Sequence, residues 1–267
     1  MANQSQKAIG VCHRMERLNG IRTYIFSAIC FLFWSAAGFA QQGVTTLGIQ
    51  FRPMIPSKYF GITTELESSE GLTAEYSPRF GHNFGMVIRR GFTKAISFET
   101  GICLVQRNYR VALDLAGFPG RQEMDFRFIG YEIPVQGLVF VQLGDELWMN
   151  ASGGLSLDMY PSNVETFGEA RRDTVIYDLY QKTWRNGRLQ LSLLANYGFE
   201  WRTKENGYFY AGLSYHRPFN RIGFSEVEVR EKTNVYRLEH MLSGNYLTVD
   251  LRYYFAEDPE RPSKKRK

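Results

Sequence analysis

Apolar and polar residues alternate with a period of two along residues 188–217. The apolar positions of the first half are Leu189, Leu191, Leu193, Ala195, Tyr197, Phe199 and Trp201. After a polar turn at residues 203–207, the alternation resumes with Phe209, Ala211, Leu213 and Tyr215. A period of two places alternate side chains on opposite faces of a β-strand. The segment therefore predicts two long antiparallel strands joined by a short turn.

The same alternation recurs in six other segments, which gives eight predicted strands. They span about residues 45–51, 79–90, 95–111, 124–141, 147–159, 188–202, 208–217 and 246–255. Long loops are expected at residues 52–77, 161–187 and 218–244, the last of them with a hairpin signal, and a medium loop at residues 114–123. The apolar face changes parity near Phe128, which predicts either a bulge or a strand that leaves the membrane there.

This pattern predicts an all-β fold, an eight-stranded antiparallel transmembrane β-barrel with long extracellular loops and short periplasmic turns. A tilted strand needs ~9–11 residues to cross a bilayer, and an even number of strands closes the sheet. A soluble β-sandwich or a lipocalin-like barrel is the alternative, but it would turn its apolar face inward. An apolar face on seven of eight strands is too extensive for the interior of such a barrel.

The two ends of the chain differ from the middle. Residues 1–40 have the layout of a secretory signal peptide, since Arg14, Arg17 and Arg22 precede a short apolar run and small residues precede Gln41. A membrane anchor is the alternative, although the run is shorter than the ~20 residues of a spanning helix. The formal net charge of +5 comes from this segment and from a basic periplasmic tail at residues 256–267. Residues 41–255, the predicted barrel, are neutral, so no nucleic-acid partner is predicted.

Composition adds two limits. Aromatic residues make up 15% of the chain and charged residues only 22%, which fits an aromatic-rich β protein. Removal of residues 1–40 leaves Cys103 as the single cysteine, so neither an internal disulfide nor a multi-cysteine metal site is predicted. No glycine-rich phosphate loop and no metal-ligand motif is present in the sequence, and no cofactor is predicted.

Charged residues occupy the face opposite the apolar one, and they should therefore point into the barrel. This set comprises Arg79, Arg89, Glu99, Arg107, Glu132, Asp158, Glu200, Arg202, His216, Asp250 and Arg252. Charges removed from water are tolerated when they are paired. We therefore expect Glu99, Arg107, Glu132, Asp158, Glu200, Arg202, Asp250 and Arg252 to form a polar network that plugs the barrel. A narrow ion path is the alternative.

Catalytic and binding candidates are few. Ser214 and His216 lie on one face of a strand and are the weak candidates for a lipid hydrolase, so the chain is predicted to be non-enzymatic. The loop at residues 161–187 carries Arg171, Arg172, Tyr177 and Trp184, a mixture of arginine and aromatic side chains that is typical of binding surfaces. We expect these residues to contact lipopolysaccharide, and recognition of an envelope protein partner is the alternative.

Several segments together resemble the outer-membrane β-barrel proteins of Bacteroidota, including the PorT-like group. They are the signal ending Phe39-Ala40-Gln41, a first strand with the sequence GIQFRP at residues 48–53, and a last strand with the sequence LTVDLRYYF at residues 247–255. The resemblance implies an outer-membrane protein of a Gram-negative cell with a structural, binding or envelope- and secretion-associated role. A lipid-modifying hydrolase and a small transport or secretion component are the alternatives. The resemblance also implies that Phe255 is the signal for the barrel-assembly machinery, although twelve residues follow it.

Overall fold

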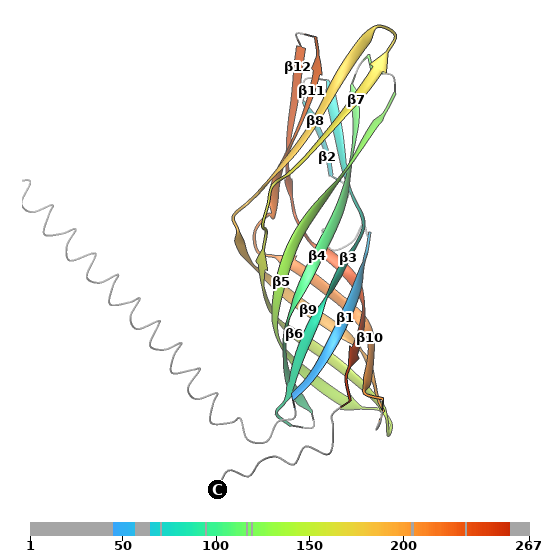
Figure 1. The fold of residues 1–267 in the computed structure, drawn as a ribbon, viewed down its shortest axis with the longest axis vertical. Coiled ribbons are helices and arrows are strands. Elements are labelled where there is room, and N and C mark those ends of the chain that lie inside the picture. Colours follow the sequence, from blue (N-terminus) through green and yellow to red (C-terminus); the bar gives the residue numbers. More distant parts are fainter. Residues whose placement is uncertain are drawn as a thin grey trace, which may run out of the picture. The chain divides into compact units, whose positions relative to one another are not determined.

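A computed structural model describes residues 45–56, 65–69, 71–93, 95–115, 117–118, 120–203, 206–232 and 234–256. The predicted signal peptide at residues 1–40 and the tail beyond Ala256 lie outside the described residues. Every regular element in the described part is a strand (Figure 1). Among these residues there is no helix with the length and apolar character needed to cross a membrane.

Thirteen strands are present in the described residues, whereas the alternation predicted eight, so the predicted total was wrong. Their bounds are β1 Thr45–Ile55, β2 Glu65–Ser69, β3 Leu72–Gly91, β4 Ile96–Leu115, β5 Gln122–Gln142, β6 Leu147–Met159, β7 Val164–Arg172, β8 Val175–Arg185, β9 Leu189–Arg202, β10 Tyr208–Pro218, β11 Gly223–Glu231, β12 Asn234–Leu242 and β13 Tyr246–Tyr254.

Eight of these strands pair in a closed ring. The order is β1-β13-β10-β9-β6-β5-β4-β3, every pairing is antiparallel, and β3 pairs again with β1. These eight strands coincide with the eight segments that alternation predicted. Closure leaves no unpaired edge among them, because each strand has a hydrogen-bonded neighbour on both sides.

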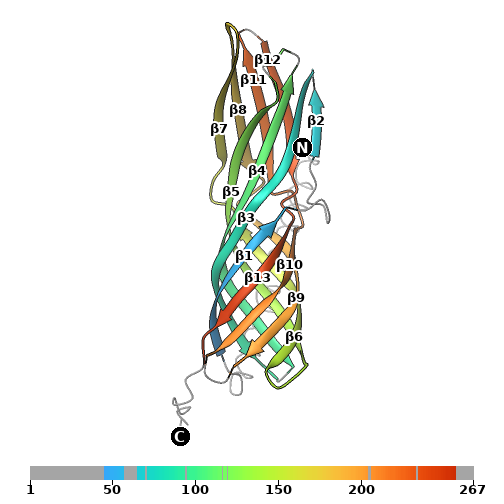
Figure 2. The same ribbon diagram turned by 90° about the vertical axis from the view of Figure 1, so that its right-hand side faces the viewer.

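The remaining strands form a second structure at one end of the ring, which we call the extension (Figures 1 and 2). One of its walls consists of β2 and the parts of β3, β4 and β5 that reach beyond the ring, at residues 72–79, 108–115 and 122–130. The other wall is a four-stranded sheet in the order β12-β11-β8-β7. The predicted loops at residues 161–187 and 218–244 are therefore β-hairpins, and the hairpin expected in the second of them is confirmed.

The extension has its own apolar core between the two walls. Leu72, Val111, Leu113 and Phe128 are fully buried there, and the opposite wall contributes Val227 and Val229. Packed apolar side chains of this kind stabilise a domain, whereas a solvated loop has none to bury. The described residues of the extension therefore form an ordered structure.

The chemistry of the two faces reverses along β5. Met124, Phe126 and Phe128 point inward within the extension, and Glu132 and Gln136 continue the same buried face within the ring. The pairing of β5 with β4 and β6 keeps one register throughout, so the bulge predicted near Phe128 is absent. A register shift occurs instead in β3, between Arg79 and His82.

The outward face of the ring is apolar. Along β9 the residues from Leu189 to Trp201 that the alternation assigned outward are exposed, with the exposed fraction of Trp201 at 56%, while Gln190, Ser192 and Glu200 are buried. The same holds on β3 for Phe84, Met86 and Ile88. A continuous apolar belt of this size is unfavourable in water and favourable in hydrocarbon.

Candidate functional site

An ion-pair network fills the interior of the ring. Among the described residues it contains five arginines and five carboxylates, namely Arg52, Arg89, Arg107, Arg202 and Arg252 with Glu99, Glu132, Asp158, Glu200 and Asp250. All are buried except Arg202, which is half-buried. The structure thus brings together all eight residues expected in the plug.

Glu99 is the centre of the network near the short turns. Its oxygens accept hydrogen bonds from Arg89 Nε at 3.1 Å, Arg252 Nη1 at 2.5 Å, Tyr254 Oη at 2.5 Å and Gln136 Nε2 at 3.0 Å. Each arginine also has a second carboxylate, since Arg89 bonds Glu200 and Arg252 bonds Asp250. Interleaved charges of this kind offset the cost of removing each ion from water.

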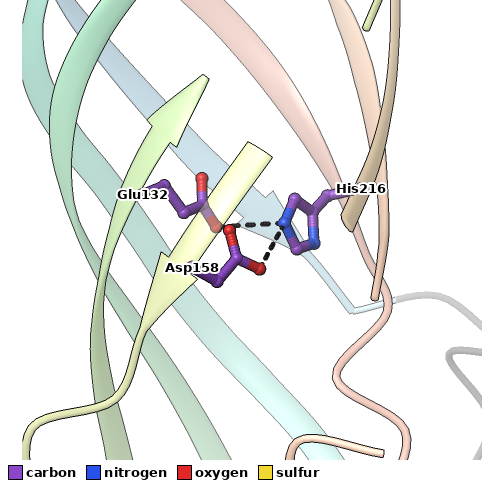
Figure 3. Close-up of side chains that lie close together, drawn as sticks. All are labelled: Glu132, Asp158 and His216. Atoms are coloured by element: carbon purple, nitrogen blue, oxygen red, sulfur yellow. Dashed lines mark ion pairs between the residues drawn. The ribbon is translucent and has the colours of Figure 1, made fainter. Parts of the chain in front are cut away.

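A second cluster lies where the ring meets the extension. Glu132 on β5, Asp158 on β6 and His216 on β10 point toward one another from three strands (Figure 3). His216 Nε2 lies 3.0 Å from Asp158 Oδ2 and 3.4 Å from Glu132 Oε1. All three side chains are 1% exposed, so the cluster is sealed from solvent.

Both carboxylates of the cluster have other partners. Glu132 accepts hydrogen bonds from Asn83 at 2.9 Å, Arg107 at 3.2 Å, Arg52 at 3.3 Å and the Tyr246 hydroxyl. Asp158 accepts from Ser192 Oγ at 2.5 Å and from Ser156 Oγ at 2.6 Å. The ring of Tyr246 stacks on His216 with the centroids 4.5 Å apart. The lone pairs of the carboxylates are therefore largely used within the chain.

We tested whether the cluster fits a metal ion, because one ligand atom from each of Glu132, Asp158 and His216 lies within 4.8 Å of the others. Carboxylate and imidazole groups are suitable ligands for several divalent metals. However, Arg52 and Arg107 both contact Glu132, and a bound cation would lie next to two guanidinium charges in a buried site, where bulk solvent screens charges little. The donor set therefore fits a closed ion-pair cluster better than a divalent cation.

The geometry does not support the hydrolase pair. Ser214 Oγ donates to Asp250 Oδ2 at 2.5 Å and accepts from Asn196 Nδ2 at 2.6 Å, so its partners are not the imidazole of His216. Ser192 and His216 both contact Oδ2 of Asp158, so the hydroxyl of Ser192 donates to this carboxylate. A serine nucleophile requires a hydrogen bond to its base and access for a substrate, and neither is present here.

Two arginines differ from their predicted positions. Arg79 was expected in the ring interior but is exposed on the outside, because the register shift between Arg79 and His82 changes the parity of β3. Arg52 was assigned to a loop but lies on β1, buried, 3.3 Å from Glu132. The loop expected from residue 52 begins later, because β1 continues through Pro53, which pairs with His82.

The predicted loop contacts lie on strands. Arg171 is exposed beside Glu169, and Arg172 donates to the carbonyl of Gly117 at 3.0 Å. Trp184 is half-buried beside Phe224. Tyr177 belongs to the core of the extension with an exposed fraction of 4%, so its side chain is not available at the surface.

A shallow cavity of about 370 Å³ lies on the outer face of the four-stranded sheet. Phe167, Tyr180 and Trp184 line it together with Lys182 and Glu165, which form an ion pair at 2.5 Å. Arg237 is likewise paired with Glu228, at 2.8 Å. Aromatic side chains next to neutralised charges make this face a candidate binding surface.

Phe255, the predicted assembly signal, directly follows the last ring strand. Its side chain is 47% exposed and its backbone N–H donates to the carbonyl of Leu47 at 2.9 Å. The terminal aromatic side chain is thus fixed at the seam where β13 pairs with β1.

No protein-family profile matches the chain, and no curated protein sequence matches it. Among solved structures the chain is similar to the outer membrane protein OprG from Pseudomonas aeruginosa, with a TM-score of 0.43, 9% identity, and coverage of 80% of this chain and 96% of that one. It is also similar to the outer membrane protease OmpT from Escherichia coli, with a TM-score of 0.29, 11% identity, and coverage of 80% and 96%. A third is the β domain of the Bordetella autotransporter BrkA, with a TM-score of 0.25, 9% identity, and coverage of 79% and 98%. These likenesses are too low to carry a function, and the resemblance to PorT-like proteins stays a prediction.

Proposed function

We propose that the chain is a non-enzymatic β-barrel protein of a Gram-negative outer membrane, in which the eight-stranded ring crosses the bilayer and the extension projects outside the cell. The observation that carries this proposal is the reversal along β5. Within the ring the buried face is polar and the exposed face is apolar, and within the extension the opposite holds. Such a change along one uninterrupted strand is expected when its lower part lies in hydrocarbon and its upper part in water.

The ring interior supports a plugged barrel over an open pore. Eight strands leave space for side chains only, and here the space holds Glu99, Glu132, Asp158 and their arginine partners. The apolar core of the extension lies at one end of this network, with Tyr160 and Phe128 in ring contact at 5.2 Å. An ion entering from that end would meet apolar side chains before it reached a polar group.

A gel assay tests membrane insertion. The full-length protein, purified in detergent without boiling, should migrate differently from the boiled sample, because a closed barrel resists unfolding by the detergent of the gel. It should also remain with vesicles after a wash at alkaline pH. Recovery of the protein in the soluble fraction would contradict the proposal.

A conductance assay tests the plug. The purified protein inserted into a planar bilayer should give no steady current, since its charges are paired and buried. The control is a variant with Glu99→Ala and Arg252→Ala, which removes one carboxylate and one arginine from the network and keeps its net charge. A large and steady conductance of the unmodified protein would show that the interior conducts.

The extension is the part to which we assign a binding role. Its outer sheet presents the cavity beside Phe167, Tyr180 and Trp184, and Phe167 is 67% exposed. Because the cations there are paired with carboxylates, this surface suits a neutral or zwitterionic ligand. Binding of such a ligand should be weakened by Phe167→Ala and left unchanged by Phe219→Ala, which removes an aromatic side chain that is 60% exposed just after the end of β10.

A further inference from the structure

A row of polar residues crosses the outside of the molecule where the ring meets the extension. Arg79 on β3 is paired in register with Asn108 on β4, and Asn108 is paired with Arg127 on β5. Arg79 and Arg127 are exposed, and Asn108 is half-buried between them. Neighbouring strands are about 4.8 Å apart, so the backbones of the two arginines are about 10 Å apart. At that spacing both guanidinium groups can reach one small ligand above Asn108.

The row lies at the border of the apolar belt. On the side of the ring, Phe80 directly follows Arg79 and is 60% exposed. The next paired row is His82, Gln106 and Ile129, and the row after it is Phe84, Leu104 and Tyr131. On the side of the extension the neighbouring row contains Arg110 and Asp125, which are charged. The row therefore marks the height at which the outer surface changes from apolar to polar.

The guanidinium groups of Arg79 and Arg127 can bind an anionic ligand. Among the described residues no ion pair joins Arg79 or Arg127 to a carboxylate. The nearby carboxylate of Asp125 is held by Arg110, whose Nε donates to Oδ1 at 2.7 Å and whose Nη2 donates to Oδ2 at 3.0 Å. These hydrogen bonds hold the pKa of Asp125 below its usual range. Arg110 is thus the hydrogen-bonding partner of Asp125, and Arg79 attracts the same carboxylate only through space.

A hollow of about 560 Å³ opens beside the row, between β5 and β7. Arg79, Asn108 and Arg127 line it together with the apolar side chains of Phe80, Tyr109 and Val164 and with Asp125, the carboxylate held by Arg110. Tyr109 stacks on Phe126 with a centroid distance of 5.4 Å, which gives the hollow a rigid floor. Its size lies within the usual range for small-ligand sites, about 300–1,000 Å³. It combines two cations and an apolar wall next to the belt with one carboxylate, Asp125, whose charge is paired with Arg110.

We propose that this hollow binds the phosphate of an anionic membrane lipid, with the acyl chains along Phe80 and the apolar belt below it. Arginine forms paired hydrogen bonds with phosphate oxygens, and two arginines on one phosphate hold it by charge and by geometry. Asn108 uses one amide hydrogen for the carbonyl of Phe80 at 2.7 Å, and its second hydrogen is directed to the same ligand. The inference rests on the proposed insertion of the ring into a membrane.

The test uses the full-length protein in uncharged detergent micelles and dihexanoyl phosphatidic acid as the probe. Binding is measured by ³¹P NMR titration, with dihexanoyl phosphatidylcholine and inorganic phosphate as separate arms. We expect phosphatidic acid to bind best. Each of Arg79→Gln and Arg127→Gln should weaken it about tenfold, since each removes a hydrogen bond between charged groups. Arg121→Gln, an equal change of charge at an arginine of the extension that is 53% exposed, is the matched control and should leave binding unchanged.

The outcomes separate the two proposals. Equal affinity in Arg127→Gln and Arg121→Gln, in a protein that still shows the mobility shift on heating, overturns the lipid site and leaves membrane insertion standing. Binding of inorganic phosphate as tight as that of phosphatidic acid overturns the assignment to a lipid. A protein with no mobility shift and no association with vesicles overturns both. Because Arg79 and Arg127 are exposed, neither substitution removes a packed side chain, and the heat shift checks the fold of each variant.

Discussion

The substitution Glu99→Gln tests whether paired charges hold the ring interior together. It keeps the shape of the side chain and removes its charge. Four groups donate to Glu99, namely Arg89, Arg252, Tyr254 and Gln136. An amide group in place of one oxygen presents its own hydrogens to two of these donors, so two buried hydrogen bonds lose their acceptor.

The size of the effect follows from the remaining contacts. Removal of one partner of a buried ion pair typically costs about 3–5 kcal/mol. Arg89 keeps Glu200 and Arg252 keeps Asp250, so neither arginine is left without a carboxylate. We therefore expect a loss near the lower limit, about 3 kcal/mol of the free energy of unfolding.

Equilibrium unfolding in urea measures this loss, with the protein folded in lipid vesicles and followed by tryptophan fluorescence. The matched control is Glu123→Gln, the same chemical change at a carboxylate that is 47% exposed and bonded to Arg110. Surface ion pairs contribute about 0–1 kcal/mol. If the two variants lost the same free energy, the interior charges would not stabilise the ring, and the plug would have to be explained by packing alone.

Three other predictions concern separate parts of the chain. Gly198→Ala should destabilise the ring by about 1–3 kcal/mol, because a Cβ there would lie 2.4 Å from the carbonyl oxygen of Ala211. The control Gly137→Ala should be neutral, because no atom lies within 4 Å of the position of its Cβ. Equal urea midpoints of the two variants would refute this prediction. The pKa of Asp125 is lowered by its hydrogen bonds from Arg110, so its stabilising contribution is present above the ordinary value of about 3.9 and is lost as the pH falls through the lowered value. Arg110→Ala should raise this pKa in an NMR titration of the carboxyl carbons, and an unchanged value would contradict the assignment. Deletion of residues 256–267 should leave assembly in the outer membrane intact if Phe255 is the signal, whereas Phe255→Ala should reduce the folded fraction on an unboiled gel.

The ring was predictable because its two faces differ strongly at every second position. In β9 each apolar residue from Leu189 to Leu193 alternates with Gln190 or Ser192, and the structure exposes the first set and buries the second. The extension was not predictable in this way. In β8 the inward face runs from Tyr177 and Leu179 to Gln181 and Thr183, and its outward face carries Tyr180 and Trp184. Neither face has a uniform chemistry, so the period of two does not appear as an alternation of apolar and polar residues.

The alternation in the sequence predicted which residues belong to the candidate site, but not which of them contact one another. Alternation alone places Glu132, Asp158 and His216 on the inner face of three strands. Their meeting depends on the heights of β5, β6 and β10 around the ring, and β10 is not a hydrogen-bonded neighbour of β5. These heights are set by the registers of the strand pairs between β5 and β10. Strand β5 pairs with β6 at Glu132 and Asp158, and β6 pairs with β9 at Asp158 and Gln190. A sequence pattern with a period of two gives the face of each residue but not its height.

Three adjacent strands reverse their chemistry at one height, and this has a consequence for the way the chain meets a membrane. Apolar residues point inward in the extension at Tyr76, Val111 and Phe126 and point outward in the ring at Phe84, Leu104 and Tyr131. The strands β4 and β5 pass this height without a bulge, so backbone geometry does not cause the reversal. The reversal follows from the surroundings of each face. In the extension the inner face packs in an apolar core and the outer face meets water. In the ring the inner face lines a polar interior and the outer face forms the apolar belt. Arg79, Asn108 and Arg127 form the row between the outer surface of the extension and the apolar belt of the ring. A membrane that covers the belt would place the phosphates of its lipids at this row.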